Sequence, residues 1–199
     1  MIRSFVIIYI PGALFLQSVL GLVRDYIMYL TNVVCSANIG CMIDLRRLCY
    51  SISDVRYDPR RFPGLIWQHR KIGGNCLVFS SGVINCNGKA TSFEEGFKRL
   101  RRYARRLQKL GLKVELKDVK CITVSASHAL SADLNLELLA KERPSIYEPE
   151  LFPTVNFKTR GVTFSCFRSG KIVITGIKRK SQIDDVVYPV FIELELYTR

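Results

Sequence analysis

The chain contains the same pattern twice, and this duplication constrains its fold more than any other feature. Residues 56–63 (RYDPRRFP) are echoed by residues 146–153 (IYEPELFP) at an offset of 90. Residues 76–88 (CLVFSSGVINCNG) are echoed by residues 164–176 (FSCFRSGKIVITG) at an offset of 88. A repeat of about 90 residues predicts two similar structural units in one chain of 199 residues.

Each repeat predicts an antiparallel meander of short strands, because its segments are rich in β-branched and aromatic residues and are separated by Gly-Gly and Ser-Gly turns. The expected strands are residues 65–70, 77–81 and 83–87, and then 154–159, 162–168 and 171–175. Alternation along a strand places Ile84 and Ile174 on the face that helices cover. The opposite face then carries Asn85, Asn87, Val173 and Thr175. Strand alternation alone does not decide whether Phe79 and Phe167 lie in the core or are exposed to contact a ligand.

Helix signals follow the strands. Ser92 with Glu95 three residues later is a capping box that opens a long helix, and Gly111 is a plausible end for it. Asp-Leu pairs at 44–45 and 133–134 are expected to open a short helix in each repeat.

The charge of the chain is strongly positive and unevenly distributed. It has 30 Lys and Arg against 17 Asp and Glu, a net charge of +13. Residues 93–113 hold eight basic and two acidic residues, so +6 of this charge lies on the long helix. A solvated helix face is the ordinary explanation for such a run, but crowded cations repel one another and favour a polyanionic or acidic protein partner.

The N-terminal stretch is different in character. Residues 4–23 contain no charge over 20 positions, which is about the length that crosses a bilayer, although Pro11 and Gly12 interrupt it. Three interpretations stay open: a signal anchor, a buried appended helix, or a stretch outside the working protein. With an anchor, the protein would be a membrane-attached basic protein whose long helix lies on anionic lipid.

The sequence contains few patterns of the kind that carry catalysis or metal binding. The seven cysteines are odd in number, form no CxxC pair and lie mostly in apolar segments, which indicates free buried thiols in a reducing compartment. With two histidines no standard zinc site can be drawn, and no nucleophile or phosphate-loop motif occurs. We expect neither an enzyme nor a cofactor.

Several blocks of the sequence resemble one known family. Residues 147–153 (YEPELFP), 78–82 (VFSSG), 174–176 (ITG) and 103–111 (YARRLQKLG) are similar to the core of the TATA-box-binding protein family, in the right order and over about residues 30–199. The resemblance implies an α+β, pseudo-symmetric saddle: a curved antiparallel sheet of about ten strands with helices on its convex face. The implied organisation is an apolar extension at 1–28, a first repeat at 29–117 and a second at 118–199.

The resemblance also implies how such a protein meets promoter DNA. Its concave sheet lies on the minor groove of TATA or A·T-rich DNA and kinks it, with Phe62, Phe79, Phe152 and Phe167 prying the base steps apart. The implied groove-reading positions are Asn32 and Thr123 at the centre, with Asn85, Asn87, Val173 and Thr175 beside them. The candidate phosphate contacts are Arg61, Arg70, Lys158 and Arg160. Asn85, Asn87 and Thr123 depart from the family pattern, which predicts a weaker or shifted preference for a TATA sequence.

Protein contacts are implied as well. A loop with Glu148 and Glu150 is expected to bind transcription factor IIB, and the basic helix to bind other regulators with acidic surfaces. Transcription factor IIA and TATA-binding-protein-associated factors are further expected partners of the protein. The helix positions are Lys98, Arg101, Arg102, Arg105, Arg106 and Lys109. Between Gly176 and Tyr188 the chain is three residues shorter than between Gly88 and Tyr103, which predicts a shortened second long helix or entry loop.

The resemblance leaves two family roles open, both nuclear and both non-enzymatic. One is a general initiation factor, and the other is a TATA-binding-protein-like paralogue that acts mainly through factors IIA and IIB with weak TATA preference. Because the chain keeps all four phenylalanines, the first is favoured. The sequence also leaves open whether the protein forms a homodimer when it is not bound to DNA.

Overall fold

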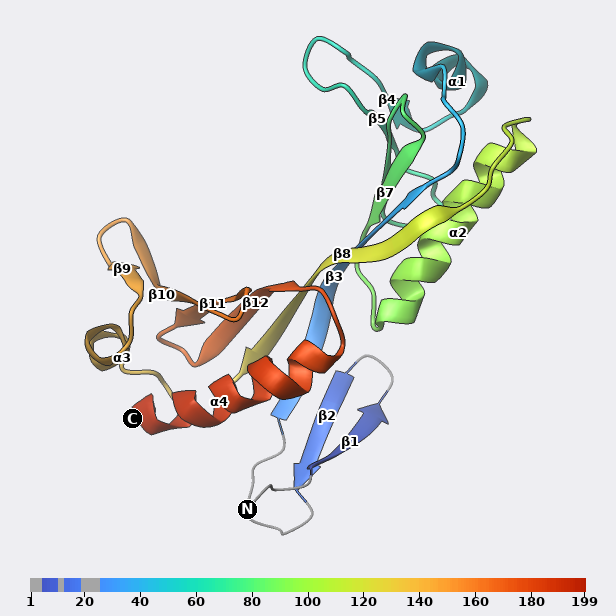
Figure 1. Cartoon of the computed structure of the whole chain (residues 1–199). Helices are drawn as coiled ribbons and strands as arrows, with labels where there is room; N and C mark the ends of the chain where they lie inside the picture. Colours follow the sequence, from blue (N-terminus) through green and yellow to red (C-terminus); the bar gives the residue numbers. More distant parts are fainter. Residues whose placement is uncertain (1–4, 11–12, 19–25) are drawn as a thin grey trace. The chain divides into compact units, whose positions relative to one another are not determined.

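The structure is a computed structural model that describes the backbone of residues 5–10, 13–18 and 26–199, and side chains from residue 26 onward (Figure 1). It divides into two compact units. We call Asn32–Thr123 the α2 unit, and Val124–Arg199 together with the chain up to Thr31 the α4 unit.

The α2 unit is an antiparallel sheet with two helices. Its strand order is β4, β5, β6, β7, β3 and β8. The strands are β4 (Val55–Arg56), β5 (Leu65–Trp67), β6 (Asn75–Val78), β7 (Val83–Asn87), and parts of β3 (Tyr26–Asn38) and β8 (Lys117–Ala129). The helices are α1 (Leu45–Ser51) and α2 (Phe93–Lys109). The expected meander is confirmed by the pairing of β5 with β6 and of β6 with β7.

The α4 unit repeats this plan. From β8 its strand order runs through β12 (Lys171–Ile177), β11 (Val162–Phe167), β10 (Phe152–Thr159) and β9 (Ile146–Glu148). Its helical segments are α3 (Leu136–Glu142), the π-helical turn η1 (Ile183–Val187), α4 (Tyr188–Leu194) and the 3-10 turn η2 (Glu195–Tyr197). The hydrogen-bonded path β4–β5–β6–β7–β3–β8–β12–β11–β10–β9 contains ten strands, so the expected α+β fold of two repeats is confirmed.

One face of each sheet is buried by helices. In β7 the buried residues are Ile84 and Cys86, and in β12 they include Ile172 and Ile174, as strand alternation predicted. Helix α2 lies directly on this face, since a Cβ at Gly96 would approach Val33 Cγ1 to 2.4 Å. The approach explains why the sequence has glycine there: any side chain would push the helix away from the sheet.

The buried face changes sides within β3. Tyr26, Met28 and Leu30 are buried in the α4 unit, whereas Val33 and Cys35 are buried in the α2 unit. The buried apolar positions are therefore even before Thr31 and odd after Asn32, while the polar Ser36 is buried as well. Side chains alternate with a period of two, so this change requires a local irregularity at the point where the strand passes from one unit to the other.

The ends of the helices agree with the sequence except in one repeat. The Ser92 side chain accepts a hydrogen bond from the Glu95 backbone amide, and α2 ends before Gly111, which has φ +91°. Asp44 caps α1 as expected. The prediction that Asp133 opens the second short helix is wrong, because Asn135 is its N-cap and accepts from the Leu138 amide.

The second long helical segment is shorter than α2, as expected: η1 and α4 together run from Ile183 to Leu194, 12 residues, whereas α2 has 17. Buried residues in α2 fall at 96, 99, 100, 103, 104 and 107, and the same spacing recurs at 183, 186, 187, 190, 191 and 194, a constant offset of 87. Tyr188 is therefore not the counterpart of Tyr103. The chain lengths from Gly88 to Tyr103 and from Gly176 to Tyr188 do not compare equivalent positions. Tyr188 directly follows the π-helical turn and is buried in addition to these six residues.

Two further strands precede β3. β1 (Phe5–Ile10) pairs with β2 (Ala13–Ser18), and β2 pairs with β3, with Leu14 opposite Met28. Where the expected appended helix would lie, the described residues 5–10 and 13–18 are strands; Pro11, Gly12 and the end of the uncharged stretch lie outside the described residues. Within the described residues, no helix has the length and hydropathy needed to cross a membrane.

All seven cysteines are free thiols. Four of them are buried and three are half-buried, in agreement with their apolar sequence environment.

Candidate nucleic-acid interface

The uncovered face of the α2 unit carries an ordered row of side chains. The register of its strands aligns Arg56, Ile66, Leu77, Asn85 and Ser36, one from each of β4, β5, β6, β7 and β3. The residues on either side of this row along the strands, such as Trp67, Cys76 and Cys86, are buried under the helices. We call this alignment the first row.

The α4 unit carries an equivalent row. Its strand register aligns Ile146, Asn156, Ser165, Val173 and Ser127, from β9, β10, β11, β12 and β8. These positions follow the first row at offsets of 88 to 91, so each is the repeat counterpart of a first-row residue. We call this the second row. A neighbouring pair in each unit, Asn75 with Asn87 and Thr163 with Thr175, is equivalent in the same way.

The two rows distribute polarity differently. On β7 and β12 the first repeat is the more polar, with Asn85 against Val173. On the adjoining strands the order reverses, because Leu77 is matched by Ser165. Taken over the rows, each unit offers both apolar and hydrogen-bonding side chains.

Phe62 and Phe79 lie together beside the first row, where β5 begins and β6 ends. Phe79 follows β6 in a tight turn to β7, and Phe62 precedes β5. Their rings meet edge to face with centroids 5.8 Å apart. Gly64 makes room for the pair, because a Cβ at that position would lie 2.6 Å from Phe62 Cε1 and 3.0 Å from Phe79 Cε1. Both rings are half-buried.

The corresponding pair in the α4 unit is more open. Phe152 begins β10 and is 56% exposed, and Phe167 ends β11 half-buried with the Lys171 ammonium 5.9 Å from its ring centre. The counterpart of Gly64 is Thr154, which is buried and accepts a hydrogen bond from Asn156. A residue with a Cβ therefore stands where the first repeat has the glycine on which its ring pair packs.

Asn32 and Thr123 hold the central positions of the long strands β3 and β8. The Asn32 side-chain oxygen accepts a 2.9 Å hydrogen bond from the Gly88 backbone amide. This contact orients the carboxamide so that its NH2 group is the part left to donate. Within the described part of the chain, no hydrogen bond engages that NH2 group or the Thr123 hydroxyl.

The four candidate phosphate contacts separate into two kinds. Arg61 and Arg70 are exposed, but each is near an aspartate, Asp58 at 3.6 Å and Asp54 at 3.9 Å respectively. Lys158 pairs with Thr163 across β10 and β11, on the uncovered face, and Arg160 lies in the following turn with φ +46°. In residues 26–199, neither Lys158 nor Arg160 has an ion-pair partner.

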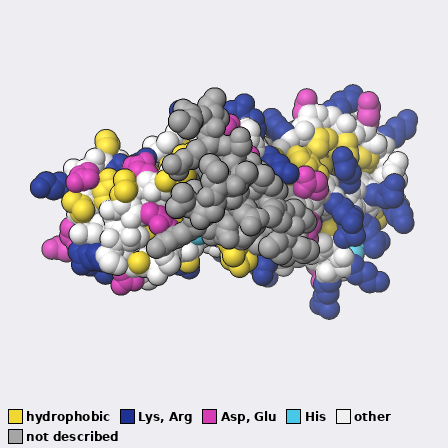
Figure 2. Space-filling view, turned by 90° about the horizontal axis from the view of Figure 1, so that it is seen from below, with side chains coloured by type: hydrophobic (Ala, Val, Ile, Leu, Met, Phe, Trp, Pro, Cys, Tyr) yellow, Lys and Arg dark blue, Asp and Glu magenta, His cyan; other side chains and the backbone are white. Residues whose placement is uncertain are grey.

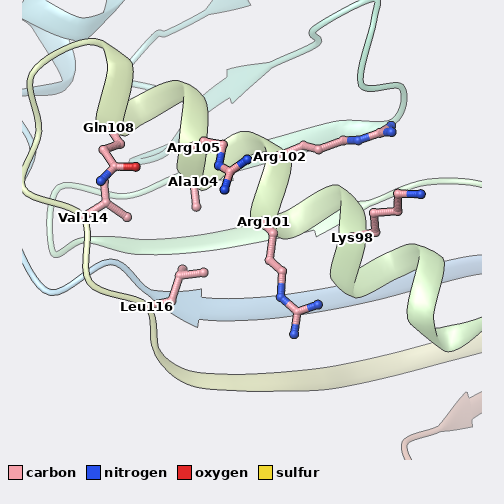
Figure 3. A pocket seen from close by; sticks show the side chains of 8 residues that line it. All are labelled: Lys98, Arg101, Arg102, Ala104, Arg105, Gln108, Val114 and Leu116. Carbon is pink, nitrogen blue, oxygen red and sulfur yellow. The ribbon is translucent and has the colours of Figure 1, made fainter.

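The exposed side of α2 is the most basic surface of its unit. The six cations expected to face partners lie along this helix and all six are exposed: Lys98, Arg101, Arg102, Arg105, Arg106 and Lys109. Figure 2 shows Lys and Arg side chains gathered over this half of the chain. A hollow of about 550 Å³ lies beside the helix, between Lys98, Arg101 and Arg105 on α2 and Val114 and Leu116 of the segment that follows it (Figure 3).

Arg99 behaves unlike the other cations of α2. It is buried, and its guanidinium donates to the backbone oxygens of Gly88 and Lys89, the latter at 2.5 Å. Gly74 and Gly88 lie against it, so a Cβ at Gly88 would come within 3.1 Å of the guanidinium carbon. Arg99 therefore holds the β7–α2 loop, which also carries the amide that orients Asn32.

Glu148 and Glu150 are both exposed at the turn between β9 and β10. Leu151 beside them is 80% exposed, and its backbone amide donates to the Glu148 carbonyl oxygen. Two carboxylates and an exposed leucine on one turn are accessible to a partner with a basic and apolar surface.

Comparison with known proteins identifies the family. Residues 28–110 and 118–196 match the family described as "Transcription factor TFIID (or TATA-binding protein, TBP)", once for each repeat. The chain belongs to the TATA-binding protein family.

Relatives within the family include proteins named as TATA-box-binding proteins and proteins named as TATA-box-binding-protein-like. The chain is 38% identical over 169 residues to "TATA box-binding protein-like 2" of Mus musculus, covering 81% of this chain and 48% of that protein. It is 36% identical over 171 residues to "TATA-box-binding protein 1" of Triticum aestivum, covering 82% and 73%. The chain thus spans about half the length of the mouse relative.

The same family appears among solved structures. The chain superimposes on "Methanococcus jannaschii TBP" with a TM-score of 0.73 and 28% identity, covering 85% of this chain and 98% of that one. The family fold therefore accounts for nearly all of both repeats.

The sequence predicted the strands that complete the rows, but it did not single out the row residues on them. Alternation within β5, β6, β10 and β11 places these residues on the uncovered face: Ile66, Leu77, Asn156 and Ser165. The signal that could have found them is the 88- and 90-residue offset, which pairs Leu77 with Ser165 and Ile66 with Asn156.

Proposed function

We propose that the protein is a nuclear general transcription initiation factor that binds the minor groove of TATA or A·T-rich promoter DNA through its two rows and kinks it. The observation that carries this is the equivalence of the rows, each with two phenylalanines beside it at the ends of its inner strands. A flat apolar ring at the edge of a sheet replaces base stacking when it enters a base step, which opens the groove to the rows.

The chemistry of the rows suits the minor groove better than the major groove. A·T pairs offer only acceptors there, adenine N3 and thymine O2. The oriented NH2 group of Asn32 is a donor to such atoms, and no carboxylate lies in either row to repel them. Ile66, Leu77 and Val173 supply the apolar contact that a widened minor groove accepts. The separate basic surface of α2 is then free for proteins.

For the protein partners we propose two surfaces. The turn with Glu148 and Glu150 suits the basic surface of a factor such as transcription factor IIB. The α2 cations suit acidic surfaces, as in transcription factor IIA or the TATA-binding-protein-associated factors. The hollow between α2 and residues 114–116 gives such a partner an apolar floor beside the arginines.

The test is a DNA-bending assay on a TATA duplex labelled at both ends. The wild-type chain should bend the duplex strongly, and the double variant Phe79→Ala, Phe167→Ala should bend it much less. Phe97→Ala, which alters a half-buried phenylalanine of α2 away from the rows, is the matched control. Equal bending by the wild type and the double variant would show that these rings are not wedges.

A second function, the paralogue, is favoured by one observation: Thr123 stands opposite Asn32 in the repeat and offers a hydroxyl in place of a carboxamide. This asymmetry weakens recognition at the centre of the site. The paralogue predicts similar affinity for TATA and G·C-rich duplexes together with binding of factors IIA or IIB. The same assay with a G·C-rich duplex distinguishes the two functions, because an initiation factor that reads A·T pairs must prefer the TATA duplex.

A further inference from the structure

Four cysteines lie side by side across four neighbouring strands of the α2 unit. Cys76 of β6 is in register with Cys86 of β7, and Cys86 is in register with Cys35 of β3. The next strand is β8, whose Cys121 is hydrogen-bonded to the Cys35 thiol. We call the sequence Cys76, Cys86, Cys35, Cys121 the thiol row.

The row suits sulfur–sulfur chemistry and does not suit a metal. Residues opposite each other on adjacent antiparallel strands have Cβ atoms about 4.5–5.5 Å apart, and a disulfide needs about 3.5–4.5 Å. This spacing applies to the in-register pairs Cys76–Cys86 and Cys86–Cys35. Cys35 and Cys121 lie on the neighbouring strands β3 and β8 and are joined by a hydrogen bond, so a small local shift can also bring their sulfurs into bonding distance. Four sulfurs in a line cannot surround one ion tetrahedrally. Consistently, the described residues contain no group of three His, Cys, Asp or Glu able to hold a metal ion.

Cys121 is the reactive end of the row. Cys35, Cys76 and Cys86 are at most 1% exposed, whereas Cys121 is half-buried and open to small solutes. The hydrogen bond that Cys35 donates to the Cys121 sulfur lowers the pKa of Cys121 and raises that of Cys35. The thiolate is the form that reacts with oxidants, so Cys121 is the better nucleophile and Cys35 remains a protonated neighbour beside it.

We propose that Cys121 and Cys35 are a redox-active pair, in which Cys121 reacts with a peroxide and Cys35 then closes a reversible disulfide between β8 and β3. These are the strands that also carry Thr123 and Asn32, so the disulfide would form beside the central positions of the interface. An accessible thiolate next to a resolving thiol is the arrangement that peroxide-sensing cysteines require.

The chemistry balances with hydrogen peroxide as the oxidant. The Cys121 thiolate attacks one peroxide oxygen, the O–O bond breaks, and with one proton taken from solvent the products are Cys121 sulfenic acid and water. The Cys35 sulfur then attacks the sulfenic sulfur, an S–S bond forms, the S–O bond breaks, and the Cys35 proton leaves with the hydroxyl as a second water. A dithiol reductant reverses the reaction by thiol–disulfide exchange.

The experiment treats the reduced full-length chain with substoichiometric hydrogen peroxide, blocks remaining thiols with N-ethylmaleimide and maps disulfides by mass spectrometry after non-reducing digestion. We expect a peptide pair cross-linked through Cys35 and Cys121, which disappears on adding dithiothreitol. Cys121→Ser should abolish this product. Cys41→Ser, at a half-buried cysteine outside the row, should leave it unchanged.

A second variant separates the two steps and does not depend on forming the disulfide. In Cys35→Ser the resolving thiol is missing but a hydroxyl remains that can donate to the Cys121 sulfur. Cys121 sulfenic acid should therefore accumulate and be trapped by a cyclohexanedione probe, whereas the wild type should trap little. The proposal is overturned if Cys41 or Cys49 is oxidised before Cys121, if Cys121 forms only intermolecular dimers, or if Cys35→Ser shows no more trapping than wild type.

Discussion

The backbone amide of Gly88 donates a 2.9 Å hydrogen bond to the side-chain oxygen of Asn32, across 56 residues of sequence. Arg99 holds the same loop from the other side by donating to the Gly88 carbonyl oxygen. The orientation of the central asparagine is therefore set by a buried cation of α2. In this way a residue of the helix-covered face determines which atoms the uncovered face presents.

Replacing Asn32 with aspartate tests this orientation. The introduced carboxylate would still accept from the Gly88 amide, but its second oxygen would be an acceptor where Asn32 has a donor. Facing the acceptors of an A·T minor groove, N32D should lower affinity for a TATA duplex by about tenfold or more. The measurement is fluorescence anisotropy at fixed salt concentration.

The matched control is Asn135→Asp. It adds the same charge at the N-cap of α3, where aspartate caps as well as asparagine. If Asn135→Asp lowers DNA affinity as much as N32D, net charge explains the loss and the assigned role of Asn32 fails.

Gly64 controls the packing of the first phenylalanine pair. Gly64→Ala places a methyl group 2.6 Å from Phe62 Cε1, so the half-buried rings must move apart. Overpacking at this site should cost about 1 kcal/mol in the free energy of unfolding, because the rings can shift toward solvent. Bending of a TATA duplex should fall by more than this small loss of stability explains, since a displaced ring no longer enters its base step.

The repeat supplies the control for this change. Thr154→Ser alters the equivalent position but keeps the Cβ and the hydroxyl that accepts from Asn156, so Phe152 has no new neighbour to avoid and the second row keeps its hydrogen bond. We expect bending to be unchanged. Thermal melting followed by circular dichroism, measured beside the bending assay, separates unfolding from ring displacement; a Gly64→Ala protein that bends DNA normally contradicts the argument.

Two sets of cations should differ in how they affect the salt dependence of DNA binding. Lys158 lies on the uncovered face beside the second row, whereas Arg105 lies on the exposed side of α2. Each phosphate neutralised by a protein cation contributes about 0.9 to the slope of log affinity against log salt. Lys158→Ala should reduce the slope by about that amount, and Arg105→Ala should leave it unchanged.

Titrations of a labelled duplex at several salt concentrations measure both slopes. An equal reduction in the two variants would place α2 on the DNA. A change in neither would remove Lys158 from the phosphate contacts.

Local sequence signals predicted the parts of the fold that depend on local chemistry. The alternation that buries Ile84 and Cys86, and the Ser92 cap with Glu95, need only neighbouring residues. The Asp133 prediction failed because two good N-cap residues stand two positions apart. The choice between them depends on the C-terminal chain, where the Tyr197 carbonyl oxygen accepts from the Asn135 amide and Leu134 bridges to Thr198.

The candidate interface residues that stand in family motifs were predicted from the sequence. The candidate interface residues whose alignment depends on strand register were not. The four phenylalanines and Asn32 stand in recognisable motifs, but the alignment of Ile66, Leu77 and Asn85 depends on loop lengths between strands. The burial of Arg99 was likewise invisible, since a helical arginine among seven other basic residues gives no local sign that a loop will fold over it.

Tyr103 ties α2 to the sheet edge beside the β5–β6 loop. Its hydroxyl accepts from the His69 amide at 3.1 Å and lies 3.1 Å from the Gly74 carbonyl oxygen, while its ring meets Trp67 at 5.2 Å. Tyr103→Phe keeps the ring but leaves these part-buried backbone groups without their hydroxyl partner, so it should lower the free energy of unfolding by about 1 kcal/mol. Tyr29→Phe, on a side chain that is 52% exposed, should have no effect.

Loss of the Tyr103 hydroxyl should also change how the free energy of unfolding depends on pH. Burial raises the pKa of Tyr103 to about 12 from an ordinary value of about 10. Because the folded state holds this proton more tightly than the unfolded state, the stabilisation is complete below pH about 10 and is lost as the pH rises toward 12. Urea unfolding of the reduced protein between about pH 9 and about pH 11.5 should show a steeper fall in stability for wild type than for Tyr103→Phe. Parallel curves would mean that the Tyr103 proton does not contribute; part of the slope should remain in the variant, because burial also raises the pKa of Tyr188 to about 12.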